Sequence, residues 1–425
     1  MDIKRVLFII ISVLLITGCT VKHNNFPGGN NNEDGKTIEE NNSENGTTAE
    51  ENNQSKEEPK EPLNQLEIQI ENMTLEEKIG QILLVGMDGY DTDDNIVELM
   101  QSYHVGGIIL YGKNVKDSKQ LLSLINSLKN SNSSNKIPLF ISVDEEGGSV
   151  SRNPREIKKL PTARSIGKTK DVGLAFKVGK LLGQTVGAFG YNMNFAPVLD
   201  IDSNPLNPVI GDRAFGQTAE IVSSMGIETL KGIKKEGVIP VVKHFPGHGD
   251  TAVDSHIGLP VVNHDLERIM NFEILPFKHA IDSGADAVMV AHILLSQMDQ
   301  EYPASMSEII ITDTLRDKLN FQGVIITDDM TMGAIEKNYN IGDAAIQSVK
   351  AGADILLIGH EYEKSLTVLG AIKDEINKGN ILMDRIDESV YRILKLKEKY
   401  NLKDSVIGDL NIEEINNRID SLFGR

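Results

Sequence analysis

The feature that most constrains the fold of this chain is a series of short apolar runs separated by segments with helical periodicity. Several runs are apolar on both faces, as in Ile355–Ile358. Strands of this kind that alternate with helices indicate a parallel sheet covered on both sides. Eight strand–helix units predict an α/β fold, a single TIM (β/α)8 barrel. The runs are Gln81–Gly86, Val105–Tyr111, Ile137–Asp144, Asn192–Asp200, Val238–His244, Ala287–His292, Gly323–Asp328 and Asp354–Gly359.

The barrel is expected to occupy residues 62–402 as the one catalytic domain. Thr74 and Glu77 have the spacing of a capping box, which opens the first helix. An amphipathic helix around Tyr391–Tyr400 closes the domain, and residues 403–425 form a polar C-terminal tail.

Residues 1–19 have the organisation of a targeting signal. A charged start with Lys4 and Arg5 precedes the apolar stretch Val6–Ile16, which is short for a membrane span. The stretch ends in small residues before Cys19, the single cysteine of the chain. This resembles a bacterial lipoprotein signal, in which that cysteine is lipid-modified. The chain is then expected outside the cytoplasm, anchored to the cell membrane through Cys19; an ordinary signal peptide or a short anchor helix is the alternative.

Residues 20–61 are rich in Asn, Glu, Gly and Ser and contain ten acidic and four basic residues, a balance of 4 − 10 = −6. Such a segment buries too little apolar area to offset its ordering entropy, so we interpret it as a disordered tether.

Composition excludes some partners. The net charge of −19 disfavours nucleic acid, which requires a basic surface. The absence of Trp argues against a long polysaccharide groove and suits a small pocket.

Polar residues collect where the predicted strands end, which is where TIM barrels place their active sites. Asp144 follows the third strand, Lys243 and His244 end the fifth, and Asp328 ends the seventh. Asp200, Asp202 and His292 also lie at strand ends, with structural roles as well supported as substrate contact.

The segment Lys243–His256 is the densest in polar groups, with three His, two Asp and one Lys. It allows three interpretations: a polar surface loop, a zinc site, or acid–base catalysis by His256 held by Asp254. The metal interpretation is weakened because the first strand ends without the His-x-His that barrel metallohydrolases require.

Five motifs in order resemble glycoside hydrolase family 3, most closely the single-domain β-N-acetylglucosaminidases of bacterial cell-wall recycling. The resemblance spans about residues 65–400, the whole predicted barrel. The motifs are DEEGGSVSR from Asp144, NFAPVLDI from Asn194, GDRAFG from Gly211, KHFPGHGDTAVDSH from Lys243 and GVIITDDMTMGAI from Gly323.

The resemblance implies that Asp328 is the nucleophile of a retaining glycosidase. Asp329 competes for this role; because side chains alternate along a strand, only one of the two is expected to face the pocket. The resemblance further implies that His256 is the acid/base, with Asp254 beside it. This Asp-Ser-His element points to an aminosugar, since family 3 β-glucosidases lack it.

The sugar-holding residues implied by the resemblance are Asp144, Arg152, Arg213, Lys243 and His244. Glu145 and Ser149 depart from the residues that relatives often carry.

The expected function is that of a retaining exo-β-N-acetylglucosaminidase that removes terminal N-acetylglucosamine from muropeptides or chitooligosaccharides. The two-step mechanism requires no metal or cofactor, and we expect a monomer. The alternatives are a family 3 β-glucosidase, an N-acetylglucosaminide phosphorylase and, more distantly, a non-catalytic sugar-binding lipoprotein.

Overall fold

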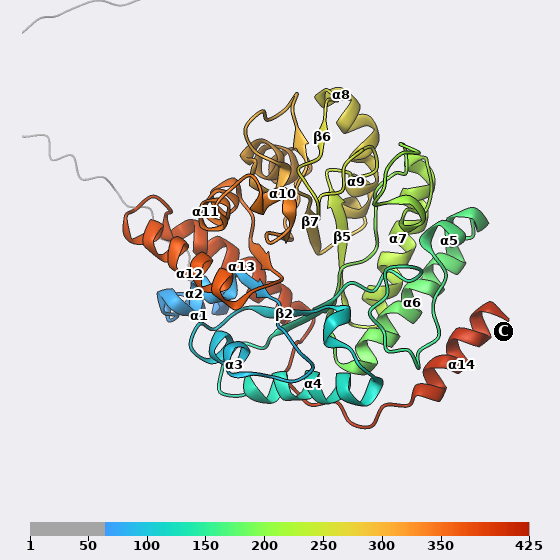
Figure 1. The fold of residues 1–425 in the computed structure, drawn as a ribbon, viewed down its shortest axis with the longest axis horizontal. Coiled ribbons are helices and arrows are strands. Elements are labelled where there is room, and N and C mark those ends of the chain that lie inside the picture. The colour runs from blue at the N-terminus through green and yellow to red at the C-terminus, as the bar shows by residue number, and fades with distance from the viewer. Residues whose placement is uncertain (1–63, 425) are drawn as a thin grey trace, which may run out of the picture. The chain divides into compact units, whose positions relative to one another are not determined.

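The computed structural model describes residues 64–424, and in this part of the chain eight parallel strands close into a barrel (Figure 1). The order around the barrel is β1-β10-β9-β7-β5-β4-β3-β2. Each barrel strand overlaps one of the eight predicted runs, so the predicted TIM barrel is confirmed. The barrel strands are β1 (Leu83–Val85), β2 (Gly107–Leu110), β3 (Phe140–Val143), β4 (Met193–Asn194), β5 (Ile239–Phe245), β7 (Ala287–Val290), β9 (Val324–Asp329) and β10 (Ile355–Ile358).

The strands are buried on both faces because helices cover the outside and side chains fill the interior. At Gly107, an added Cβ would lie 2.6 Å from the Cβ of Phe140 and 2.7 Å from Leu84 Cδ1, so the interior has no room there for a side chain. The barrel interior is therefore closely packed at this level.

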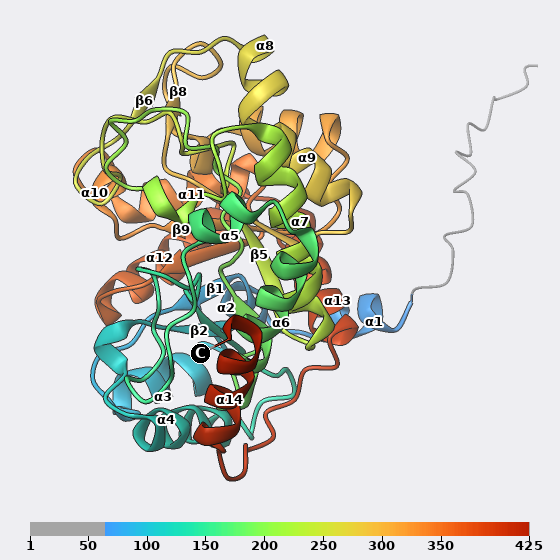
Figure 2. The ribbon, with the colours of Figure 1, turned by 90° about the vertical axis from the view of Figure 1, so that its right-hand side faces the viewer.

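The helices alternate with the strands around the outside (Figures 1 and 2). They are α1 (Gln65–Glu71), α2 (Leu75–Gln81), α3 (Asp94–Gln101), α4 (Ser118–Ser131), α5 (Ala163–Thr169), α6 (Val172–Phe189), α7 (Ala219–Lys235), α8 (Leu266–Arg268), α9 (Leu275–Asp282), α10 (Gly333–Glu336), α11 (Ile341–Ala351), α12 (Tyr362–Asn377), α13 (Met383–Lys399) and α14 (Ile412–Phe423), with 3₁₀ turns η1 (Gly112–Asn114), η2 (Gly211–Arg213) and η4 (Ala304–Met306) and π-helices η3 (Ile269–Glu273) and η5 (Ile309–Lys318). None of the helices in this part of the chain is long and apolar enough to cross a bilayer.

Two β-bulges lie at the mouth of the barrel. Between β9 and β10, Ile355 pairs with Ile326. A regular ladder would then pair Leu357 with Asp328, but the register shifts by one residue and Leu357 pairs with Asp329. Between β5 and β7, a similar shift falls between Val242 and Phe245. A bulge inserts one extra residue and interrupts the alternation of side chains, so consecutive residues can face the same side.

Two further elements lie outside the ring of strands and helices. The short strands β6 (Val261–Val262) and β8 (Leu294–Leu295) pair above the mouth, near α8 (Figure 2). Within the predicted polar tail, α14 forms an additional helix that packs against α6 and buries Ile415 and Ile419.

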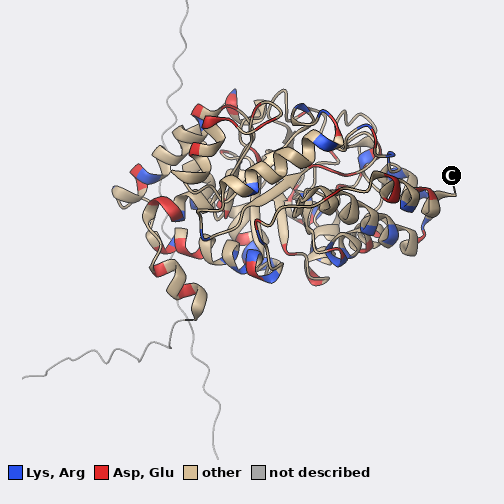
Figure 3. Ribbon diagram, turned by 90° about the horizontal axis from the view of Figure 1, so that it is seen from below, with Lys and Arg blue, Asp and Glu red and all other residues tan. Residues whose placement is uncertain are grey.

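Charged residues fasten the outer helices to the strands. Asp354, which is 1% exposed, pairs with Arg316 and with Arg392 at 3.1 Å, and it accepts the backbone N–H of Ile325 at 2.9 Å. Elsewhere, acidic and basic residues are scattered over the outer helices (Figure 3).

Candidate active site

A cavity of about 400 Å³ opens at the C-terminal ends of the barrel strands. Seven of the eight side chains predicted for catalysis or sugar binding line it, and the eighth, Asp254, lies directly behind His256. The seven are Asp144, Arg152, Arg213, Lys243, His244, His256 and Asp328.

Lys243 and His244 are consecutive on β5, and both line the cavity. Asp328 and Asp329 are consecutive on β9, and both line it as well. The prediction that only one of these two aspartates faces the pocket is wrong, because the bulge in β9 interrupts the alternation on which it relied.

Four charged side chains form one network at the floor of the pocket. Lys243 Nζ lies 2.5 Å from Asp144 Oδ1 and 2.8 Å from Glu146 Oε1. Arg213 binds Glu146 through two parallel hydrogen bonds of 2.7 and 2.8 Å. Burial alone would raise the pKa of Glu146, but the charges of Lys243 and Arg213 hold it well below its usual range. Glu146 is therefore a permanent anion that orients two cations toward the cavity.

His244 adopts a defined tautomer. Its Nδ1 lies 2.6 Å from Asp200 Oδ2, and its Nε2 lies 3.3 Å from Arg213 Nη2. Because a guanidinium can only donate, Nε2 accepts and the ring proton is assigned to Nδ1. Asp200 is fully buried, so its role is to orient His244 rather than to meet a substrate.

The two neighbouring aspartates differ in what their carboxylates bind. Asp329 accepts hydrogen bonds from the Tyr111 hydroxyl at 3.1 Å and from the backbone N–H groups of Gly359 and Thr331 at 2.9 Å, and His360 Nδ1 lies 3.1 Å from it. Gly359 is required for this arrangement, since an added Cβ would collide with both Asp329 Oδ2 and the Tyr111 hydroxyl.

Asp328 makes one hydrogen bond, from the backbone N–H of Asp329 at 2.8 Å, among the contacts of the described residues. Burial would raise the pKa of Asp328, but its interactions with His292 and His244, together with that N–H, lower it. It is thus an ionised carboxylate whose second oxygen is free to reach a ligand.

Asp254 and His256 lie on the loop after β5. Asp254 Oδ1 accepts the backbone N–H of His256 at 2.9 Å and contacts the ring Nδ1 at 2.8 Å. Burial would raise the pKa of Asp254, and the two bonds to His256 lower it. With Nδ1 held by an anion, Nε2 is the nitrogen available to exchange a proton in the cavity. The His256 side chain is 65% exposed, so solvent reaches it.

The turn after β3 positions Arg152. Glu145, which is 1% exposed, accepts the backbone N–H of Arg152 at 2.8 Å, and burial raises the pKa of the Glu145 carboxyl to about 7. The Arg152 guanidinium contacts the carbonyl of Ser151 at 3.4 Å and lines the cavity.

Among the charged and aromatic residues that line the cavity, sequence reasoning missed Glu146, Tyr111 and His360. Glu146 offered a signal, as an acidic residue two positions after Asp144 at a strand end. The rings of Tyr111 and His360 stack with centroids 4.9 Å apart, a contact between two segments far apart in the sequence that no local pattern encodes. Asp202 and His292, in contrast, do not line the cavity: Asp202 pairs with Arg164, and His292 is fully buried with Nδ1 2.6 Å from Ser305 Oγ.

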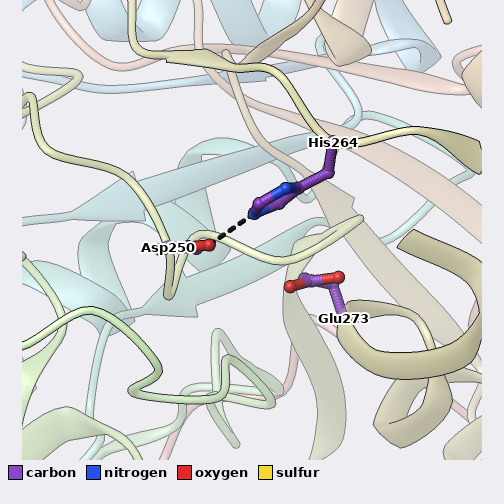
Figure 4. A group of neighbouring side chains, drawn as sticks. All are labelled: Asp250, His264 and Glu273. Atoms are coloured by element: carbon purple, nitrogen blue, oxygen red, sulfur yellow. Dashed lines mark hydrogen bonds and ion pairs between the residues drawn. The ribbon is translucent and has the colours of Figure 1, made fainter. Parts of the chain in front are cut away.

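One group in the described part of the chain has the composition of a metal site: Asp250, His264 and Glu273, whose ligand atoms lie within 4.8 Å of one another (Figure 4). Asp250 Oδ2 lies 2.5 Å from His264 Nε2, and Arg268 forms hydrogen bonds of 2.9 and 3.1 Å with Glu273 Oε1. The guanidinium thus balances the buried carboxylate, and the group ties the base of the loop after β5 to the segment around α8.

The chain belongs to glycoside hydrolase family 3. The family model described as the glycosyl hydrolase family 3 N terminal domain matches residues 74–396, which confirms the predicted family. The chain is 37% identical to beta-hexosaminidase A of Pseudoalteromonas piscicida over 327 residues, covering 71% of this chain and 54% of that protein. It is 34% identical to a beta-hexosaminidase of Methylobacillus flagellatus, covering 64% of this chain and 78% of the relative.

Among solved structures, the fold is similar to a family 3 beta-N-acetylglucosaminidase from Paenibacillus sp. str. FPU-7. The TM-score is 0.78 at 40% identity, covering 82% of this chain and 68% of that one. The chain thus spans about half of the Pseudoalteromonas protein and about two thirds of the Paenibacillus chain.

Buried His248 generates a prediction about stability. Burial lowers its pKa to about 4, against about 6.5 in an unfolded chain. Between these pH values the unfolded chain binds more protons than the folded chain. The contribution of neutral His248 to the unfolding free energy is therefore complete above pH 6.5 and is lost as the pH falls toward 4. The loss amounts to about 3.5 kcal/mol at about 1.4 kcal/mol per pKa unit. His248→Gln is expected to flatten the dependence of the unfolding free energy on pH in this window, measured by urea unfolding.

Thr251→Val is the matched control, because it removes a hydroxyl 2.8 Å from His248 Nδ1 and keeps the titrating ring. It is expected to lower stability while retaining most of the slope. Equal slopes in His248→Gln and the wild type would contradict the prediction.

Proposed function

We propose that this chain is a retaining exo-β-N-acetylglucosaminidase. Its family and the names of its relatives support hydrolysis of β-linked N-acetylhexosaminides. The single observation that carries the mechanism is the pairing of a free carboxylate, Asp328, with a His–Asp dyad at the mouth of one pocket.

In the first step, Asp328 attacks C1 of the terminal sugar as the bond from C1 to the leaving oxygen breaks. Asp328 suits this role better than Asp329, because the Asp329 carboxylate is saturated by hydrogen bonds from Tyr111, Thr331 and Gly359. A nucleophile must be free to approach carbon, whereas a saturated carboxylate serves to shape the wall.

His256 protonates the leaving oxygen through Nε2 and then accepts a proton from the water that cleaves the glycosyl–Asp328 ester. Asp254 stabilises the imidazolium form of His256 through the 2.8 Å contact with Nδ1. The imidazolium gives up its proton in the first step, and the proton from water restores it in the second.

The floor of the pocket suits a single polar sugar. Asp144 offers carboxylate oxygens to hydroxyl groups, while Lys243, Arg213 and Arg152 offer donors to hydroxyl and acetamide oxygens. A cavity of about 400 Å³ that is closed below by the packed barrel supports removal of terminal residues rather than cleavage within a chain.

We further propose that the substrates are muropeptide fragments and that the protein acts outside the cytoplasm on a lipid anchor at Cys19. This location rests on the sequence of residues 1–19, which lie outside the described residues. The tether at residues 20–61, also outside them, would then let the barrel reach wall fragments near the membrane.

The proposed function is tested with the full-length chain and 4-nitrophenyl β-N-acetylglucosaminide, the matching β-glucoside, and each substrate with and without phosphate. We expect turnover of the aminosugar alone, at a rate independent of phosphate. Dependence on phosphate would show a phosphorylase, preference for the glucoside would show a β-glucosidase, and tight binding of N-acetylglucosamine without turnover would show a sugar-binding protein.

The nucleophile is identified by trapping. A 5-fluoro N-acetylglucosaminyl fluoride slows both steps, and we expect the glycosyl–enzyme to accumulate with the label on Asp328, as located by peptide fragmentation. Asp328→Ala is expected to lower kcat by at least roughly 10³-fold. A label on Asp329 would reverse the assignment.

The anchor is tested by fractionation of bacterial cells that express the full chain. We expect the wild type in the membrane fraction and Cys19→Ala as unprocessed precursor without lipid, measured by mass spectrometry of the N-terminal peptide. Equal processing of both proteins would identify an ordinary signal peptide.

A further inference from the structure

Ser255 lies between the two members of the dyad, yet its environment differs from that of either neighbour. It is 2% exposed, whereas the His256 side chain is 65% exposed. Its hydroxyl lies 3.1 Å from His248 Nε2, and both residues line the cavity. We propose that Ser255 is a positioning residue that latches the acid/base loop over the pocket by donating this hydrogen bond to His248. The proposal rests on the proposed role of His256.

The hydrogen bonds around His248 define the direction of the latch. The Thr251 hydroxyl donates to the carbonyl of His248 at 3.1 Å, so its oxygen accepts the proton of His248 Nδ1 at 2.8 Å. Nε2 is then a bare acceptor, and Ser255 is the donor. The backbone N–H of His248 donates to buried Asp200 at 2.7 Å, which fixes the acceptor to the floor of the site.

Backbone carbonyls of the same loop contact the segment that follows β9, the strand that carries Asp328. The carbonyl of Ser255 accepts the N–H of Ala334 at 3.0 Å, and the carbonyl of Ile257 accepts Lys337 Nζ at 2.6 Å. At Gly333, an added Cβ would lie 2.5 Å from the His256 carbonyl oxygen, so the two segments approach as closely as backbone allows. These contacts hold the loop beside the segment that follows the strand of Asp328, and the hydrogen bond from Ser255 to His248 is the side-chain contact that orients the dyad within it.

The base of the loop is held by separate contacts. Asp250 contacts His264 at 2.5 Å (Figure 4), and Asn207 donates to the carbonyls of His248 and Gly249 at 2.8 and 3.0 Å. Loss of the Ser255 hydroxyl is therefore expected to let the dyad shift about its remaining contacts with Ala334 and Lys337 and to leave the rest of the site in place.

A displaced acid has a characteristic kinetic signature. When the glycosidic bond breaks, the proton of His256 Nε2 passes to the leaving oxygen, and an Asp328 oxygen replaces that oxygen on C1. A sugar hydroxyl requires this proton in order to leave, whereas dinitrophenolate leaves without it. Misplacement of His256 should therefore slow the cleavage of diacetylchitobiose and spare the dinitrophenyl glycoside, while general damage to the pocket should slow both.

The experiment compares kcat/KM for these two substrates in the full-length chain. For Ser255→Ala we expect a loss of about tenfold or more with diacetylchitobiose and less than about threefold with the dinitrophenyl glycoside. His248→Asn, whose amide can reach Thr251 but not Ser255, should behave in the same way. His248→Gln places an acceptor where Nε2 stood, so its loss with diacetylchitobiose should be smaller than that of His248→Asn. The double variant Ser255→Ala/His248→Asn should be no worse than either single variant, since both break one bond.

The matched control is Ser296→Ala, which removes a hydroxyl that donates to Asn263 outside the pocket, and it should leave both rates unchanged. Thermal unfolding establishes that each variant is folded. Equal losses on both substrates, or no loss in Ser255→Ala, would overturn the latch. His256→Ala reports separately on the proposed function: if it shows no selective loss, the assignment of His256 as the acid fails whatever Ser255 does.

Discussion

The two bulges at the mouth of the barrel are the constraint on which the site depends. A parallel strand normally directs alternate side chains inward, so one strand end supplies one functional group. In β5 and β9 the register shifts by one residue, and each strand supplies two adjacent side chains to the cavity. Lys243 thereby joins the charge network while His244 meets Arg213, and Asp328 remains free while Asp329 shapes the wall. The pocket therefore holds more polar side chains than it would if β5 and β9 each directed a single residue into it.

Charge balance follows from this crowding. Lys243 is 2% exposed and would be costly to bury alone, so two carboxylates compensate it, and Glu146 also pairs with Arg213. Burial would lower the pKa of Lys243, but Asp144 and Glu146 raise it, which keeps the ammonium charged. The cations are thus oriented before a sugar arrives, and an incoming hydroxyl meets donors that need no reorganisation.

The fold and most of the site could be predicted from the sequence because both depend on local patterns. Apolar runs identify buried strands, and the strand ends identify the mouth, so the sequence alone is enough to place Asp144, Lys243 and Asp328 in one pocket. The bulges could not be predicted, because a shift in register is a property of two paired strands. The stacked Tyr111–His360 pair is hidden from sequence reasoning for the same reason, since its rings meet only when distant segments come together. Helix α14 does have a helical pattern, but it lies in a segment whose many polar residues favour a tail.

The position of the acid/base on a loop, rather than on a strand, has a physical consequence. A carboxylic acid fixed at the end of a strand needs burial to raise its pKa. Glu145, in the turn after β3, illustrates this, because burial raises its pKa to about 7. A histidine has a pKa near neutrality in water and can therefore work from an exposed loop, but it loses the rigidity that the strand would provide. The hydrogen bond between the buried hydroxyl of Ser255 and the ring of His248, two residues of the cavity wall, restores part of that rigidity. The use of a histidine for proton transfer on a loop therefore requires a contact such as the Ser255 latch to hold that loop in position.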